Sequence, residues 1–207
     1  MRLVFLMAGG SVYIPDRVNA YFSTVVCLEH DGRVIVVDPG NLPSIDECEK
    51  MFKKHGLKPE DVTDVLLTHV HLDHIFNSIF FENAIVYVHE SFKTKDYKSF
   101  GLFYGKVYSW VIDSWKNVEF LKGGESLFGG KVRVFHTPWH AREHLSYLVH
   151  TENVGNLLIA GDLLPTRLKY YDIIKEYEKG ESKAFLEGVM DEIDIIVFSH
   201  DSPLEVK

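Results

Sequence analysis

The sequence predicts a mixed α/β (α+β) protein in which two mixed β-sheets pack face to face with helices outside, a four-layer αββα sandwich. Strand-like segments fall into two groups along the chain, and helical segments follow each group. The chain has 207 residues, of which 46 % are hydrophobic and 25 % are charged, the usual balance of a globular protein. A chain of this length can bury a substantial core, so we expect one domain over residues 1–207.

The first group of strands opens the chain. Strands are expected at Leu3–Met7, Ala20–Glu29, Arg33–Val37, Val62–Thr68 and Ile85–His89. The dipeptide Asp31-Gly32 lies between the second and third of these apolar runs, a pattern typical of a hairpin turn. The tripeptide Asp38-Pro39-Gly40 then ends the third strand.

A helix is expected over Ile45–His55. Ser44 and Glu47 match a capping box at its start, and Gly56 suits the position after its end. Cys48 lies on the apolar face of this helix, so we interpret it as a core residue. Because the chain has only two cysteines, we expect no disulfide framework.

The second group of strands follows an aromatic-rich stretch, Ser91–Trp115, which is expected to be helical or irregular. Strands return at Val118–Leu121, Lys131–His136, His144–His150 and Leu157–Ala160. A helix near Ser182–Met190 and a final strand at Ile193–Ser199 complete the chain.

Charge and hydropathy narrow the class of partner. The chain carries 22 Lys and Arg against 30 Asp and Glu, a net charge of −8, whereas a nucleic-acid coat or an anionic-membrane binder would show the opposite sign. The apolar run Leu3–Ala8 is shorter than the h-region of a signal peptide, and no segment approaches the roughly 20 apolar residues of a membrane-spanning helix. We therefore expect a cytoplasmic protein without membrane contact.

The 11 histidines gather in short clusters. The densest cluster, Thr68-His69-Val70-His71-Leu72-Asp73-His74, directly follows a predicted strand. In an extended chain His69 and His71 face the same side, and a turn can bring Asp73 and His74 to the opposite side of one cavity. Imidazole nitrogens and carboxylate oxygens suit zinc, iron or manganese better than calcium or magnesium. Asp162 follows a buried apolar run, where an unpaired carboxylate would be costly, so it too is expected to have a metal or hydrogen-bond partner.

The motif HxHxDH of this cluster resembles that of the metallo-β-lactamase-fold hydrolases, which include glyoxalase II, lactonases and RNase Z-like proteins. The resemblance spans nearly the whole chain, in the order Asp38-Pro39-Gly40, Thr137-Pro138-Trp139-His140, Gly161-Asp162 and Ser199-His200-Asp201. It implies that one metal is held by His69, His71 and His140, that a second is held by Asp73, His74 and His200, and that Asp162 bridges both.

The resemblance also implies a mechanism. Two divalent ions, zinc with iron or manganese as alternatives, would activate a bridging hydroxide, and either Asp73 or a metal-bound water could transfer the proton. No further cofactor is implied. Asp38 and Thr68 would orient the histidines. His144 has two interpretations, an orienting or substrate-contacting residue, or a strand residue with a surface hydrogen bond.

Three functions remain open at this point: a hydrolase of small-molecule esters, thioesters or lactones; a phosphodiesterase or ribonuclease; and a non-catalytic metal-binding module. A β-lactamase is disfavoured, because a cysteine ligand is absent where Asp162 stands. Trp139 replaces a family glycine, and Ile75-Phe76-Asn77 replaces a glycine-rich stretch, so we expect a narrowed pocket.

The segment Ser91–Lys122 carries six lysines against three acidic residues, together with many aromatic side chains. One hypothesis is a lid or pocket wall whose lysines, including Lys93, Lys95 and Lys98, steer an anionic substrate towards the metals. The alternative is a helix pair that buries its aromatics on the sheet or against a second copy in a homodimer, with the lysines in solvent.

Overall fold

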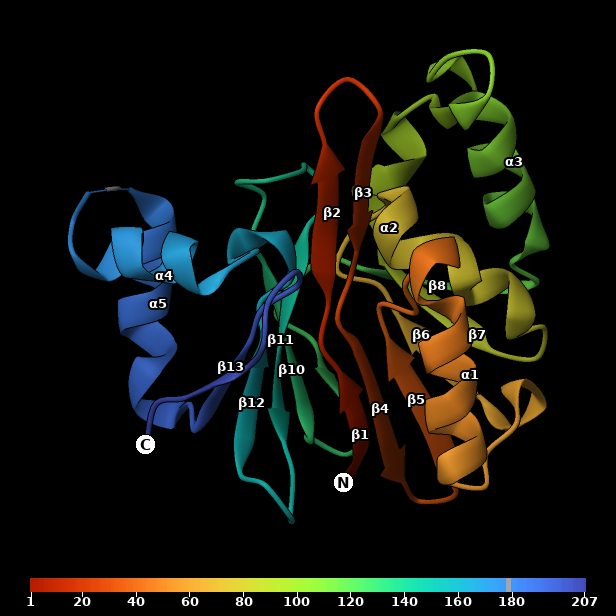
Figure 1. Ribbon diagram of the computed structural model, residues 1–207. Coiled ribbons are helices and arrows are strands. Elements are labelled where there is room, and N and C mark those ends of the chain that lie inside the picture. The colour runs from red at the N-terminus through yellow and green to blue at the C-terminus, as the bar shows by residue number, and fades with distance from the viewer. Residues whose placement is uncertain (178–179) are drawn as a thin grey trace.

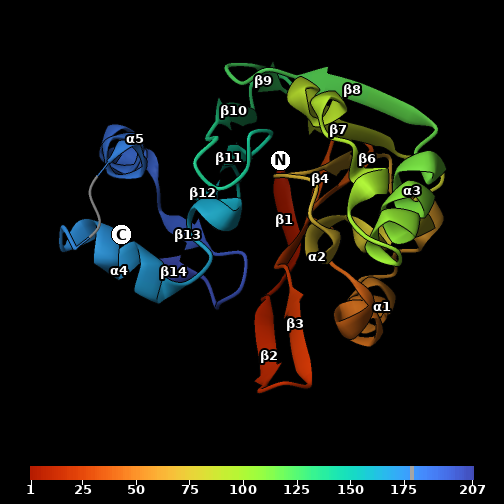
Figure 2. The same ribbon diagram turned by 90° about the horizontal axis from the view of Figure 1, so that it is seen from above.

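The computed structural model describes residues 1–177 and 180–207, and within these ranges two six-stranded sheets face each other with helices outside (Figure 1). The helices are α1 (Ile45–Lys54), α2 (Leu72–Ile75), α3 (Tyr104–Ser114), α4 (Arg167–Ile174) and α5 (Glu181–Val189). Seen from above, α1 and α3 lie on one side of the paired sheets, and α4 and α5 lie on the other (Figure 2). The predicted αββα sandwich is confirmed.

The first sheet has the strand order β1-β4-β5-β6-β7-β8. Its strands are β1 (Arg2–Met7), β4 (Val25–His30), β5 (Arg33–Val37), β6 (Asp64–Leu66), β7 (Ile85–His89) and β8 (Asn117–Leu121). The pairs β1–β4 and β4–β5 are antiparallel, whereas the strands from β5 to β8 run parallel. The carboxyl ends of β5 and β6 therefore lie at the same edge, and so do the residues that follow them.

The second sheet has the order β14-β13-β12-β11-β10-β9. Its strands are β9 (Ser126–Leu127), β10 (Val132–His136), β11 (Leu145–His150), β12 (Asn156–Ile159), β13 (Ile195–Val197) and β14 (Leu204–Glu205). Only β12 and β13 pair in parallel among the described strands of this sheet. Their carboxyl ends also share an edge.

Successive residues of a strand face opposite sides of its sheet, so the core has separate layers. Val26 and Leu28 of β4 join Tyr147 between the two sheets, while Val25 and Cys27 of the same strand face the core under α1. Because β4 is buried on both faces, its sequence is a continuous apolar run instead of an alternating one. The helix α5 covers the outer face of the second sheet.

The predicted strand Ala20–Glu29 is two strands. β3 (Val18–Phe22) pairs with β2 (Gly10–Ile14) in a separate ribbon that projects from the sandwich, and β4 begins only at Val25 (Figures 1 and 2). The break falls at Ser23 and Thr24, where the Thr24 hydroxyl donates to the carbonyl of Phe198 at 2.6 Å. The Thr24 backbone N–H also donates to the carbonyl of Ser199 at 2.6 Å, so the chain at this break bonds to a segment outside the first sheet.

Of the two local features predicted from the sequence, the hairpin turn is confirmed and the capping box is not. Asp31 and Gly32 both adopt positive φ, 47° and 77°, as the hairpin prediction requires. The capping box is wrong: the Ser44 hydroxyl donates to the carbonyl of Asn41 at 2.9 Å, and α1 begins without a side-chain cap.

Several short elements were not predicted, namely β2, β9, β14 and α4. The aromatic-rich stretch contains the 3₁₀ helices Glu90–Thr94 and Tyr97–Ser99 followed by α3. None of the helices in the described part of the chain combines the length and apolar character that crossing a membrane requires.

Candidate metal centre

The histidine cluster begins where β6 leaves the first sheet. The chain stays extended through His71 and then forms the single-turn helix α2, which carries Asp73 and His74. Val70 is fully buried and belongs to the core cluster under α1, so it anchors the loop in the core. A one-turn helix therefore replaces the turn expected from the sequence, and it directs Asp73 and His74 back towards the same space as His69.

The first group of candidate ligands combines both sheets. His69 Nε2 lies 2.8 Å from His71 Nδ1, and His140 Nε2, from the loop after β10, lies 3.2 Å from the same atom. Asp162 Oδ2, which follows β12, is 3.2 Å from His140 Nε2 and 3.8 Å from His69 Nε2. The ligand atoms of these four side chains all lie within 4.8 Å of one another.

The second group contains Asp73, His74 and His200. Asp73 Oδ2 lies 3.5 Å from His74 Nε2 and 3.4 Å from His200 Nε2. His200 follows β13, whose carboxyl end lies beside that of β12, which explains how it meets Asp162. All seven predicted ligands are thus brought together, in the two groups that the resemblance implied.

Asp162 connects the two groups. Its Oδ1 lies 3.2 Å from both His74 Nε2 and His200 Nε2, while its Oδ2 faces the first group. The Ser199 hydroxyl donates to Oδ1 at 2.6 Å, a contact that no sequence pattern predicted. One carboxylate therefore presents one oxygen to each group, the arrangement that a bridging ligand needs.

Asp38 and Thr68 fix the orientation of the histidines. Asp38 accepts hydrogen bonds from the Thr68 backbone and hydroxyl at 2.8 and 2.6 Å, and its Oδ2 lies 2.8 Å from His74 Nδ1. The bond on Nδ1 turns His74 Nε2 towards Asp162, where this atom is buried without a hydrogen-bond partner in the described chain. His200 is oriented in the same way, because its Nδ1 lies 3.0 Å from the carbonyl of Phe22.

Electrostatics at the centre favour a bound positive charge. Burial lowers the pKa of His69 and His140, and lowers that of His71 to about 4, which leaves neutral imidazoles. Burial opposes ionisation of Asp162, but neighbouring imidazoles, above all His74, hold its pKa far below the usual range. Burial also opposes a charge on His74, yet the carboxylates of Asp162 and Asp38 raise its pKa well above the usual value. Neutral imidazoles, an ionised carboxylate and a place that favours positive charge together fit a divalent cation.

Comparison with known proteins agrees with this geometry. The model of the metallo-beta-lactamase superfamily matches residues 17–200. The chain belongs to this superfamily. A solved Thermotoga maritima structure assigned to the metallo-beta-lactamases has 60 % identity and a TM-score of 0.94, over 99 % of this chain and 97 % of that one. Proteins of this superfamily generally bind divalent metals, and the candidate ligands described above form the corresponding groups here.

Two curated relatives have named activities. The N-acyl homoserine lactonase of Bacillus cereus is 26 % identical over 77 % of this chain, and the hydroxyacylglutathione hydrolase of Xylella fastidiosa is 31 % identical over 73 %. The matched regions span 65 % and 48 % of those two proteins.

His144 packs beside His69, one of the candidate metal ligands. It is fully buried, its Nδ1 lies 2.8 Å from the Thr137 hydroxyl, and its ring centroid is 5.1 Å from that of His69. A side chain on Gly161, whose φ is +56°, would place Cβ 2.6 Å from His144 Nε2. The surface hydrogen bond considered for His144 is therefore wrong, because the ring is fully buried beside His69 in space that Gly161 leaves free. Its role as an orienting residue stays a prediction.

A cavity of about 470 Å³ reaches the second group of ligands. Asp73 lines it, together with Tyr21, Leu42, Phe76, Tyr104, Val107 and neighbouring residues of the same segments. Tyr104 and Val107 of α3 thus line one wall, as the pocket-wall hypothesis expected, whereas Tyr97, Tyr108 and Trp115 of the same segment are buried in the core, as the alternative expected. Trp139 does not line this cavity, because its indole contacts Phe185 and Glu181 of α5.

Two lysines of the segment Ser91–Lys122, Lys95 and Lys93, make specific side-chain contacts. Lys95 Nζ lies 2.7 Å from Glu143 Oε1, which also accepts from the Tyr97 hydroxyl at 3.2 Å, and Lys93 Nζ lies 3.3 Å from the ring centroid of Phe120. The Glu143 side chain is fully buried, so the pair ties the segment to the loop that carries His140. This contact was not predicted, since nothing in the sequence marked Glu143 as buried.

Breaking this pair is expected to destabilise the protein by about 3–5 kcal/mol at neutral pH in Lys95→Met, because a buried carboxylate loses its cation. Burial opposes ionisation of Glu143, but Lys95 lowers its pKa, so the stabilisation is present above the unfolded pKa and is lost as pH falls. Urea unfolding should show the deficit at neutral pH and a smaller one near roughly pH 4. Adding Glu143→Gln should restore most of the loss; an unchanged midpoint in Lys95→Met would contradict the assignment.

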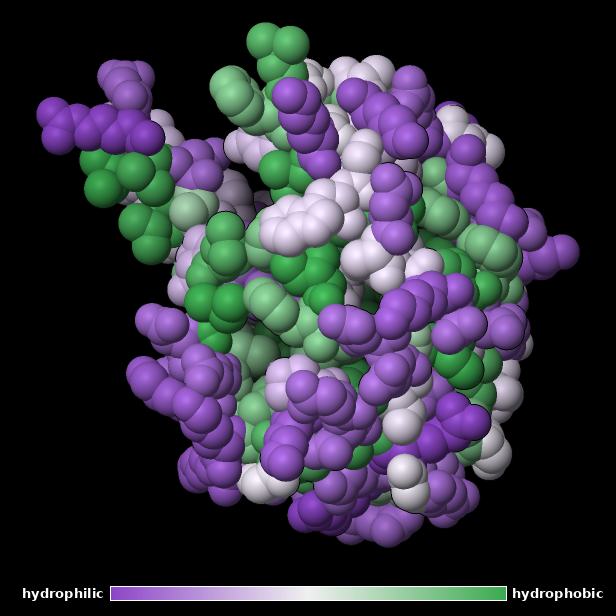
Figure 3. Space-filling model, turned by 90° about the vertical axis from the view of Figure 1, so that its right-hand side faces the viewer, coloured by the Kyte–Doolittle hydropathy of each residue, from purple (hydrophilic) through white to green (hydrophobic). Residues whose placement is uncertain are grey.

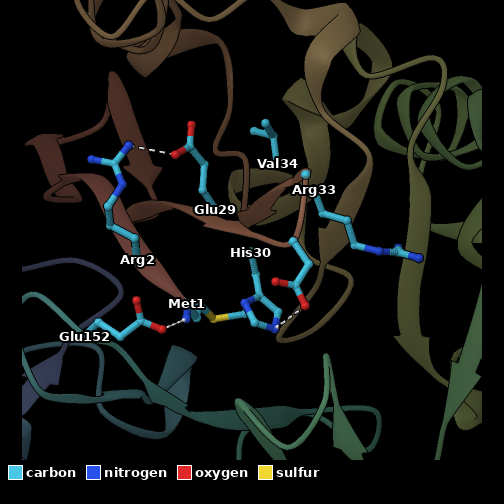
Figure 4. A pocket seen from close by; sticks show the side chains of 9 residues that line it. Met1, Arg2, Glu29, His30, Arg33, Val34 and Glu152 are labelled. Carbon is cyan, nitrogen blue, oxygen red and sulfur yellow. Dashed lines mark hydrogen bonds and ion pairs between the residues drawn. The ribbon is translucent and has the colours of Figure 1, made fainter.

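A polar hollow lies at the other end of β4 and β5, around Met1 and the turn after His30 (Figure 4). The ion pairs of Met1 with Glu152 at 2.6 Å and of Arg2 with Glu29 at 2.6 Å are drawn there, while Arg33 pairs at 2.8 Å with Asp64, which does not line the hollow. This hollow shares no residue with the metal centre, so we assign it no part in the chemistry.

Proposed function

We propose that this protein is a hydrolase with a two-metal centre, occupied by zinc, that cleaves an ester, thioester or lactone bond in a small molecule. The observation that carries the proposal is Asp162, whose two oxygens face two separate groups of nitrogen and oxygen ligands. The named activities of the lactonase and hydroxyacylglutathione hydrolase relatives support the same class of bond. The cytoplasm is the compartment we propose for it.

Divalent ions at such a centre supply an activated water and a Lewis acid for a polarised carbonyl. The chain itself contributes position and proton transfer. The Asp162 carboxylate contacts both groups of candidate ligands, and Asp38 holds the ring of His74 in its orientation. Asp73 is partly exposed on the cavity, where its carboxylate can accept a proton from the attacking water and return it to the leaving oxygen or sulfur.

The cavity beside Asp73 favours the carbonyl substrates over phosphodiesters. Its walls are mainly apolar and aromatic, and they suit an acyl or alkyl group better than a charged nucleotide. Neither Cys27 nor Cys48 can act as a nucleophile there, because both are buried in the core under α1.

Turnover of a small panel of substrates should test this function. We expect hydrolysis of a γ-lactone carrying an acyl chain, an aryl ester or an acyl thioester to exceed that of bis-p-nitrophenyl phosphate, with Asp162→Ala as the blank. A preference for the phosphodiester would favour the phosphodiesterase alternative. Full metal loading without turnover of any substrate would favour a non-catalytic metal-binding module.

Asp38→Asn is expected to weaken metal affinity or turnover by roughly 10–100-fold, the usual cost of losing a partner that orients a ligand. Asparagine is the appropriate replacement, because Asp38 adopts a positive φ of 47° that asparagine tolerates better than alanine. Competition with a zinc chelator would measure the affinity. A loss as large as that of Asp162→Ala would contradict the distinction between an orienting residue and a ligand.

A further inference from the structure

His140 differs from two other histidines of the metal centre in how its ring is held. His74 Nδ1 bonds to Asp38, and His200 Nδ1 bonds to a backbone carbonyl, so both of these rings are oriented by their second nitrogen. His140 Nδ1 has no hydrogen-bond partner among the described residues, and the side chain is 31 % exposed. The orientation of His140 therefore depends on the backbone of its own loop, residues 137–144.

A buried carboxylate attaches this loop to another part of the chain. Glu143 lies three residues after His140 and is fully buried. Its Oε1 lies 2.7 Å from Lys95 Nζ and accepts from the Tyr97 hydroxyl at 3.2 Å. Its Oε2 is buried and has no hydrogen-bond partner in the described chain, so the side-chain partners of Glu143 all lie on Oε1. A displacement of the loop would separate this buried charge from its cation, which is costly, so the contact holds the loop in place.

Both partners of Glu143 belong to residues 90–99, which form two 3₁₀ helices and are called the 3₁₀ segment here. This segment is itself fixed in the core, because Tyr97 is 5 % exposed and its ring centroid lies 5.1 Å from that of Tyr108 in α3. The helix α3 lies on the side of the molecule that Figure 3 shows, where hydrophilic and hydrophobic side chains are mixed at the surface. A further contact joins the loop to the 3₁₀ segment, since the Arg142 guanidinium donates to the Thr94 hydroxyl at 3.3 Å.

We propose that Glu143 is a positioning residue for His140 and, through it, for the first group of metal ligands. The contacts of Glu143 with Lys95 and Tyr97 hold the loop so that the His140 ring lies beside the other ligands of that group. This inference rests on the proposed two-metal centre and deepens it, because the metal affinity of one group then depends on a contact outside both groups. No ligand of the second group belongs to the loop, so that group is affected only through Asp162.

Zinc binding to the metal-free chain, measured by competition with a fluorescent chelator, tests this role. Lys95→Met leaves Glu143 buried without its cation and should weaken zinc binding by about tenfold, the lower end of the range for residues that orient a ligand. Lys95→Arg keeps a cation for Glu143 and should retain the affinity of the unchanged protein. Crystals of Lys95→Met that contain one equivalent of zinc should show anomalous signal beside the second group, because the first group is the weakened one.

Arg33→Met is the matched control. Arg33 lies 2.8 Å from Asp64, another fully buried carboxylate, which also accepts from a tyrosine hydroxyl, that of Tyr87 at 3.1 Å. Asp64 is the first residue of β6, whereas the ligands follow the carboxyl end of this strand. Arg33→Met should therefore lower the urea midpoint of unfolding, as Lys95→Met does, without changing zinc affinity.

The positioning role would be overturned by unchanged zinc affinity in Lys95→Met, or by an equal loss of affinity in Arg33→Met. An anomalous signal confined to the first group in Lys95→Met would overturn it as well. If Lys95→Met does not fold, Tyr97→Phe removes only the hydroxyl that bonds to Glu143, and unchanged zinc affinity in this variant would overturn the role. An unchanged protein that takes up no zinc would overturn the proposed metal centre together with this inference, which distinguishes the two failures.

Discussion

Asp162→Ala is expected to lose metal from both groups and to lose turnover by more than the roughly 10–100-fold typical of an orienting residue. The reason is geometric, since Oδ1 faces His74 and His200 while Oδ2 faces His69 and His140. Elemental analysis of the purified variant, beside the unchanged protein, measures the metal content. Circular dichroism should show a retained fold, because Asp162 contributes no apolar contact to the core layers.

The control for this variant is Ser199→Ala, which removes the hydrogen bond to Asp162 Oδ1 and leaves the carboxylate in place. Its metal content should remain close to that of the unchanged protein. An Asp162→Ala chain that keeps one group fully loaded would contradict a bridging role and would assign this carboxylate to the other group alone.

The sequence predicted the part of the centre that is local in the chain. His69, His71, Asp73 and His74 lie within six positions, so strand geometry and one turn suffice to bring them to one cavity. The distant ligands could not be placed by spacing, because their proximity depends on which strands pair. It is the parallel pairing of β12 with β13 that sets His200 beside Asp162, and only the family resemblance anticipated it.

Three features differ from their sequence-based prediction because of tertiary contacts. The ribbon of β2 and β3 has most of its side chains exposed, so it lacks the alternation that marks a half-buried strand. Ser44 matched a capping box, but its hydroxyl bonds to Asn41 in the preceding 3₁₀ turn. His144 was ambiguous because the sequence does not reveal that Gly161 leaves space for its ring under His69.

A matched pair of ligand variants should establish whether the centre holds two metals. His71→Ala removes a ligand from the first group only, and His200→Ala removes one from the second group only, since neither side chain belongs to the other group. We expect about two ions per unchanged chain, a lower content in each variant, and turnover reduced in both by more than the roughly 10–100-fold loss of an orienting residue.

The position of the metal that remains in each variant distinguishes the two groups of ligands more directly than the metal content does. Anomalous scattering from His71→Ala crystals should show metal beside Asp73 and His74, whereas His200→Ala crystals should show it beside His69 and His140. A mononuclear centre predicts a different outcome, in which one variant loses all metal and the other keeps the content of the unchanged protein. Because Asp162 reaches both groups, each variant should still bind its remaining ion more weakly than the unchanged protein, and chelator competition should detect this coupling.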